Sequence, residues 1–143
     1  MKKFIIACAG FLFIAQAHAG EMNSADAISV AEDYLAAYST FDVEIMAPFM
    51  ADDMVFADPT STEQNADGGA FMFDGKDAVL KGLGDYAAQY KSFSVDYDIE
   101  RRYESNGVVV FVAELTYNLV TNDDQTFSGA APIVTAITVK DGK

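Results

Sequence analysis

The strongest constraint on the fold is a change of hydrophobic period near Phe93. Before this point apolar residues recur every three or four positions, as on one face of a helix, whereas after it they alternate with polar residues as in a half-buried strand. Asn106-Gly107 is a strong hairpin signal and leads into a second apolar run, 108–120. Helices followed by long antiparallel strands predict an α+β fold, with three N-terminal helices packed in a curved antiparallel sheet.

The three helices are predicted from caps and spacing. The first begins at Asn23 or Ser24 and runs to about residue 40, and the second follows Asp42 and is shortened or kinked by Pro48. The third follows Gly75, and its glycines at 82 and 84 weaken it. All three carry an apolar face that must be buried.

Two regions of the expected strands leave alternatives open. A brief strand at 54–57 leads into a polar loop, 60–69, which either closes over a pocket as a lid or is only pinned to the core by the phenylalanines that follow it. A third long strand, 126–140, contains Gly129 and Pro132, which mark a bulge or an edge. Asp141-Gly142 is a turn signal, and a returning strand should follow it. Either the third strand is a true edge of the sheet or, as we expect, the last strand is missing from this reading frame.

The first nineteen residues are typical of an export signal. Lys2 and Lys3 form a basic start, an apolar run follows, and Ala17-His18-Ala19 resembles a cleavage site. We therefore expect a signal peptide at 1–19 and one domain at 20–143, delivered to the periplasm or secreted, with no membrane association after cleavage.

Removal of that signal limits the chemistry, because Cys8 and His18 are the only cysteine and histidine. The mature chain then lacks the side chains for Ser-His or Cys-His catalysis, disulfides and the usual zinc sites. A net charge of −13 would repel nucleic acids and anionic lipids, so neither is an expected partner. The acidic residues form no EF-hand loop, and we expect no metal and no cofactor.

Asp58 and Tyr34 are the candidate catalytic pair. Asp58 ends the short strand and lies 24 residues after Tyr34, which is on the first helix. A carboxylate and a phenol in one small pocket can move a proton. The alternatives are that Asp58, which precedes a proline, caps a turn and that Tyr34 belongs to the core.

This arrangement resembles the nuclear transport factor 2-like superfamily, in its SnoaL-like and ketosteroid isomerase-like branch. The resemblance rests on the Ala51-Asp52-Asp53 segment, on Asp58-Pro59 and on the entry to the third helix at 73–76. It implies a cone-shaped fold with an apolar pocket at the open end. It also implies Asp58 as a general base and Tyr34 as a donor to an oxyanion, a logic known from ketosteroid isomerase.

One position departs from that pattern. The isomerases have a second acidic donor after an Ala-Pro-Ile-like segment, and Val134 occupies this position. Glu114 replaces the donor only if its strand face points inward, and Arg101 either binds an acid or an anionic ligand or lies in water at a sheet end. Phe73 and Tyr38 are expected to contact a flat apolar ligand, although the simplest interpretation of Tyr38, like that of Tyr97, is a core residue.

Two functions follow from this interpretation. The first is a cofactor-free isomerase or cyclase that moves a proton on an apolar carbonyl compound. The second is an exported domain without catalysis that binds a small apolar ligand or forms a homodimer through its sheet. Because the donor is missing at Val134, catalysis would be weak or absent, and we hold the second function nearly level with the first.

Overall fold

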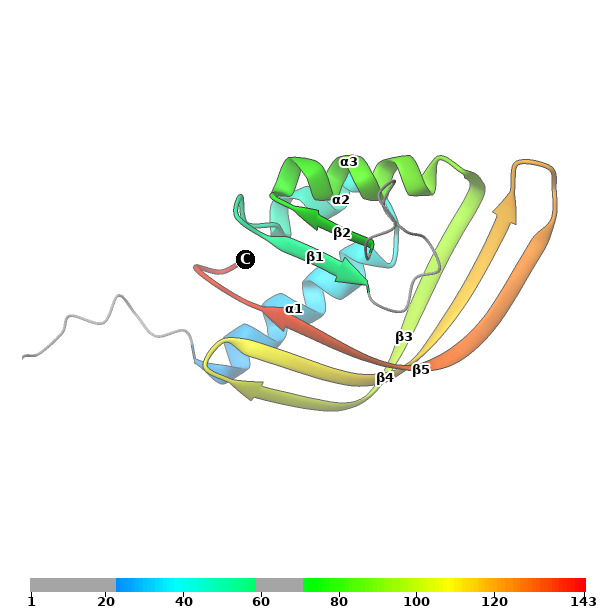
Figure 1. Ribbon diagram of the computed structural model, residues 1–143. Helices are drawn as coiled ribbons and strands as arrows, with labels where there is room; N and C mark the ends of the chain where they lie inside the picture. The colour runs from blue at the N-terminus through cyan, green and yellow to red at the C-terminus, as the bar shows by residue number, and fades with distance from the viewer. Residues whose placement is uncertain (1–22, 59–70) are drawn as a thin grey trace, which may run out of the picture.

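The predicted hairpin forms the centre of the larger of two sheets. The computed structural model describes residues 23–58 and 71–143. Strands β3 (Tyr90–Ser105), β4 (Val108–Thr121) and β5 (Thr126–Thr138) pair antiparallel in this order, and they bend strongly along their length (Figure 1). Asn106 and Gly107 form the β3–β4 turn with positive φ angles of 54° and 80°. The α+β class and the curved antiparallel sheet are therefore confirmed.

The helices begin at the predicted caps. The side chain of Asn23 accepts two backbone N–H groups at the start of α1 (Ser24–Tyr38), and Asp42 does the same for α2 (Val43–Met46). Pro48 lies in a short 3₁₀ turn, η1 (Ala47–Phe49), because its ring cannot continue the α-helix. Helix α3 (Lys76–Ala87) begins after Gly75, and no helix in these ranges is both long and apolar enough to cross a membrane.

Helix α1 contributes to both halves of the core. On one side it packs with Val109 and Phe111 of β4, and on the other with buried residues of α2 and α3 and with Met50, which follows η1. Small residues face β4 at Ala27 and Ala31, so the helix approaches the sheet closely, and Phe111 is completely buried. Figure 1 shows α1 crossing the concave side of the bent strands.

A second, two-stranded sheet lies between α1 and α3 (Figure 1). It pairs β1 (Val55–Asp58) with β2 (Phe71–Asp74), so that Asp58 lies opposite Phe71. The phenylalanines after the polar loop are thus part of a strand. The loop itself, with its predicted lid role, lies outside the described residues, as does the predicted signal peptide.

A β-bulge in β3 changes which residues face inward. The register with β4 shifts between Ile99 and Arg101, so that Arg101 lies opposite Val112 and Arg102 lies opposite the buried Phe111. Arg102 forms an ion pair with Glu32 of α1. The extra residue in the bulge reverses the alternation, so that Arg101 is exposed, which agrees with the second of its two alternatives.

Strand β5 pairs with β4 without any shift of register, so the bulge predicted at Gly129 or Pro132 is absent. Gly129 instead lies opposite Tyr117, whose hydroxyl would be 2.6 Å from an added Cβ. Within the described ranges β4 is the only strand paired with β5, and the further strand expected beside β5 stays a prediction. After β5, Lys140 and Lys143 exchange backbone hydrogen bonds across the Asp141-Gly142 turn.

The two glycines of α3 provide a matched test of the packing. Alanine is worth about 1 kcal/mol more than glycine inside a helix. At Gly84 an added Cβ would lie 3.5 Å from Val43, an ordinary contact, whereas at Gly82 it would lie 2.2 Å from the ring of Phe73. In urea unfolding, Gly84→Ala should raise the free energy of unfolding by up to about 1 kcal/mol. Gly82→Ala should lower it, and equal gains for both variants would contradict the packing of Phe73 against α3.

Candidate functional site

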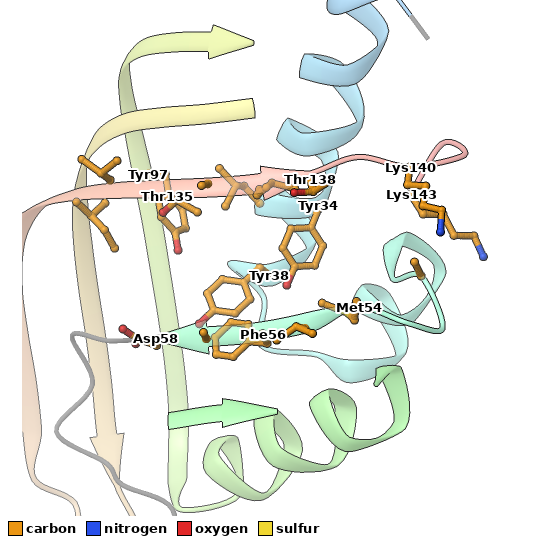
Figure 2. Close-up of a pocket in the computed structure, with 18 of the residues that line it drawn as sticks. Tyr34, Tyr38, Met54, Phe56, Asp58, Tyr97, Thr135, Thr138, Lys140 and Lys143 are labelled. Atoms are coloured by element: carbon orange, nitrogen blue, oxygen red, sulfur yellow. The ribbon is translucent and has the colours of Figure 1, made fainter. Parts of the chain in front are cut away.

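A cavity of about 530 Å³ lies between α1, β1 and β5, with Tyr97 of β3 on a further wall (Figure 2). This volume is within the usual range for small-molecule sites. Helix α1 contributes Tyr34, Leu35 and Tyr38. The other lining residues are Ala51, Asp53–Asp58, Tyr97, Ile133–Thr138, Lys140 and Lys143.

Asp58 lies at one end of this cavity. It is the last residue of β1, where the strand gives way to the loop, and it is half-buried. Figure 2 shows its carboxylate on the side of the cavity where Tyr38 also lies, with Lys140 and Lys143 at the opposite end. The predicted pair, Asp58 and Tyr34, therefore lies on the walls of one cavity.

Three phenols share this cavity and remain protonated at neutral pH. Burial raises the pKa of Tyr34 to about 12. Burial also raises the pKa of Tyr38 and of Tyr97, and the negative charge of Asp58 adds to both shifts. All three side chains thus present neutral O–H groups, which can donate hydrogen bonds to an oxyanion.

The middle of the cavity is apolar and aromatic. The rings of Tyr38 and Phe56 are stacked with centroids 6.0 Å apart, and Tyr34 lies 6.2 Å from Tyr38. The opposite end carries Lys140, whose Nζ is 3.3 Å from a carboxylate oxygen of Asp53. Such a wall suits a flat apolar ligand with a polar group directed toward Asp58.

Three residues predicted to bind a ligand do not line the cavity. Phe73 packs in the core against Phe71, with ring centroids 4.9 Å apart, and lies over Gly82. Glu114 is exposed and lies opposite Asp98 and Pro132, on the face of β4 that alternates away from the core. Arg101 is exposed because the bulge in β3 turns its side chain outward. The structure therefore does not place these three side chains at the pocket where they were expected.

Val134 borders the cavity, but its own side chain is 67% exposed. It lies opposite Val112, whereas the next residue, Thr135, lies opposite the buried Phe111. Because side chains alternate between the faces of a strand, Thr135 faces inward and Val134 faces outward. The position that was compared with the isomerase acid is thus next to the inward position, where Thr135 has a hydroxyl group.

Tyr97 is the main site residue that the sequence reasoning missed, since it was taken as core. Its place in the alternating run of β3 does predict an inward side chain, and a buried phenol needs a hydrogen-bond partner. What the sequence lacks is the position of α1 relative to β3, which brings the tyrosines of both elements to one cavity.

The side chains of the site define its chemistry. Among residues 23–58 and 71–143, no three or more His, Cys, Asp or Glu side chains are grouped so that they could hold a metal ion. The cavity combines two carboxylates, Asp58 and the Lys140-paired Asp53, with three neutral phenols and an apolar wall. A carboxylate can take a proton from carbon while a phenol stabilises the negative oxygen that forms.

The profile of the SnoaL-like domain matches residues 31–143, which is most of the chain. The protein belongs to the SnoaL-like family. No curated protein matches its sequence.

Several solved structures share the fold at low sequence identity. A protein from Shewanella putrefaciens CN-32, assigned as a SnoaL-like polyketide cyclase, is 18% identical with a TM-score of 0.63, over 84% of this chain and 82% of that one. TerC, co-crystallised with polyporic acid, is 16% identical with a TM-score of 0.60, over 82% and 85% of the two chains.

A protein of ketosteroid isomerase-like fold from Catenulispora acidiphila DSM 44928, in complex with trimethylamine, is 15% identical. Its TM-score is 0.56, and the match covers 80% of this chain and 78% of that one. These likenesses confirm the nuclear transport factor 2-like, ketosteroid isomerase-like fold that the sequence predicted. They do not choose between the activities found on it, because fold and activity are separable.

The raised pKa of Tyr34 predicts a loss of stability at alkaline pH. Below pH 10 the phenol holds its proton in both the folded and the unfolded chain, and between pH 10 and about 12 only the folded chain keeps it. Over this interval the free energy of unfolding falls as pH rises, by at most about 1.4 kcal/mol per pH unit for one phenol. Urea unfolding from pH 9 to 11.5 should show a shallower fall in Tyr34→Phe than in the wild type. Identical slopes would place the Tyr34 hydroxyl in water.

Proposed function

We propose that this protein is an exported isomerase or cyclase that acts without a cofactor on a small, flat, apolar carbonyl compound. The observation that carries the proposal is that Asp58 and Tyr34 lie on the walls of one apolar cavity of about 530 Å³. The SnoaL-like polyketide cyclase and the TerC complex with polyporic acid support a small-molecule substrate.

The reaction begins at a carbon next to the carbonyl group of the substrate. The carboxylate of Asp58 takes a proton from this carbon, and the electron pair of the broken C–H bond forms an enolate with its charge on oxygen. The hydroxyl of Tyr34 donates a hydrogen bond to that oxygen. In an isomerisation the protonated Asp58 returns the proton to a different carbon. In a cyclisation the enolate carbon forms a bond to a second carbonyl carbon, whose oxygen then receives the proton.

Export and domain limits complete the proposal. The basic start, the apolar run and the Ala17-His18-Ala19 site support removal of residues 1–19 and delivery of a 20–143 domain to the periplasm or beyond. The acidic charge of the chain supports a neutral or weakly polar ligand and argues against nucleic acid as a partner.

Proton exchange on a model ketone tests the reaction without knowledge of the natural substrate. With 2-tetralone in D₂O, wild-type protein should accelerate the replacement of α-protons by deuterium, as followed by proton NMR. Asp58→Asn should lower this rate about 10²- to 10⁴-fold, because the general base is lost. Asp77→Asn is the matched control, since Asp77 is an exposed carboxylate in the first turn of α3 and does not line the cavity.

The outcomes of this experiment separate the two function classes. Exchange that is lost in Asp58→Asn and kept in Asp77→Asn supports the enzyme. Binding of 2-tetralone without exchange by the wild type would contradict catalysis on simple ketones and would leave a ligand-binding domain. Exchange at equal rates in all three proteins would show that Asp58 is not the base.

A homodimer is the second candidate, and the outer face of the sheet favours it. This face carries exposed apolar residues in neighbouring rows, with Val134 67%, Tyr103 54% and Val108 39% exposed. Arg101 lies in the same cross-strand row as Val134, and the acidic pair Asp98 and Glu114 lies in the next row. We propose that a second copy packs against this face, so that the arginine of one copy lies near the acids of the other.

Sedimentation velocity tests this interface. The wild type should sediment as a dimer and Val134→Lys as a monomer, because a charge would be buried between the two sheets. Ile45→Lys is the control, since Ile45 is 47% exposed on α2, away from the sheet face. A monomeric wild type, or a Val134→Lys protein that remains dimeric, would contradict the interface.

A further inference from the structure

The cavity receives phenols from two different walls. Tyr34 and Tyr38 come from α1, whereas Tyr97 comes from β3 and is the only residue of that strand among the lining residues (Figure 2). The site therefore has a phenol on the sheet side, where Val134 provides neither an acid nor an inward side chain. Neither the family match nor the mechanism given above assigns a role to Tyr97.

The fold fixes the direction of Tyr97. Val95, Tyr97 and Ile99 occupy alternate positions of β3 and lie opposite Tyr117, Leu115 and Ala113 of β4. Val95 and Ala113 are buried, so this is the inner face. The bulge begins only after Ile99, which means that the reversal of alternation affects Tyr103 and not Tyr97. Figure 2 shows Tyr97 projecting from β3 into the cavity on the side where Tyr38 and Asp58 lie.

The electrostatics of the cavity agree with this geometry. Burial is the main cause that raises the pKa of Tyr97. The negative charge that Tyr34 carries once it is ionised comes next, followed by the charge of Asp58. The hydroxyl thus keeps its proton at neutral pH, and it lies close enough to both groups to respond to their charge. A group in this position also responds to the negative charge of a bound enolate.

We propose that Tyr97 is a second hydrogen-bond donor to the oxyanion, reaching it from the sheet while Tyr34 reaches it from α1. The inference rests on the proposed function, because it assumes that an oxyanion forms in this cavity. An enolate oxygen accepts two hydrogen bonds in the plane of the molecule, and donors on two walls can satisfy both at once. Tyr97 then takes the role that the second acidic donor has in the isomerases. The site therefore has a donor besides Tyr34, although a valine stands at position 134.

Ionisation of a bound phenol measures the donors directly. The probe is 4-nitrophenol, whose phenolate absorbs visible light and resembles an enolate in charge and shape. The experiment uses Asp58→Asn as the background, so that the carboxylate does not repel the phenolate. In this background the bound probe should ionise at lower pH than the free probe, because neutral O–H donors stabilise its anion.

The tyrosine variants separate donors from bystanders. A hydrogen bond to a charged group is strong enough that removing one donor should weaken phenolate binding about tenfold or more. Adding Tyr97→Phe to the background should do this and raise the pH at which the bound probe ionises by about one unit, which is the same tenfold change. Tyr34→Phe should have a similar effect. Tyr103→Phe is the matched control, because it removes a phenol of the same strand that faces away from the cavity and is 54% exposed.

Each outcome bears on a different claim. If Tyr34→Phe weakens phenolate binding and Tyr97→Phe does not, Tyr97 is no donor and the proposed function stands without it. If the Asp58→Asn protein binds no phenolate at all, the oxyanion site itself is refuted. Should Tyr97→Phe fail to fold, proton NMR of the unsubstituted complex gives the second reading. Two downfield hydroxyl protons, one assigned to Tyr97, are expected, and a Tyr97 hydroxyl unchanged by the ligand would overturn the inference.

Discussion

The close packing of α1 against β4 determines the rest of this structure. Ala27 and Ala31 lie in one cluster with Val109 and Phe111, and their small side chains allow the helix to lie near the strand. The remaining faces of α1 then point toward the other helices and toward the cavity, where Tyr34 and Tyr38 emerge one turn apart. A larger residue at Ala31 would move the helix and with it both phenols. The position of the site therefore depends on the packing of the core.

Much of the fold was predictable because its signals are local. The caps at Asn23 and Asp42, the break at Pro48 and the Asn106-Gly107 turn each act within a few residues, and the structure places each as expected. Features that depend on pairing between strands were not predictable in the same way. The alternation left open whether Arg101 points inward, and the bulge before it turns it outward. Gly129 suggested a bulge, yet the pairing of β5 with β4 is regular there, and Tyr117 of β4 packs over the glycine.

The candidate site shows the same division. Asp58 and Tyr34 were found from spacing and resemblance, and the structure brings them to one cavity. Tyr97 was classed as core, because no sequence pattern states how β3 lies relative to α1. The position compared with the isomerase acid, Val134, faces outward, and only the pairing with Phe111 shows that the next residue, Thr135, faces inward. Local chemistry is thus readable from sequence, whereas convergence of side chains from distant elements requires the fold.

The central claim is that this cavity stabilises an oxyanion next to Asp58, with phenols as the donors. A crystal structure of the Asp58→Asn protein with bound 4-nitrophenol tests it most directly. The account predicts that the phenolate oxygen lies about 2.5–3.0 Å from the hydroxyls of Tyr34 and Tyr97, with its ring against Phe56. A probe that binds with its oxygen toward Lys140 and Lys143, or outside the cavity, would contradict the account.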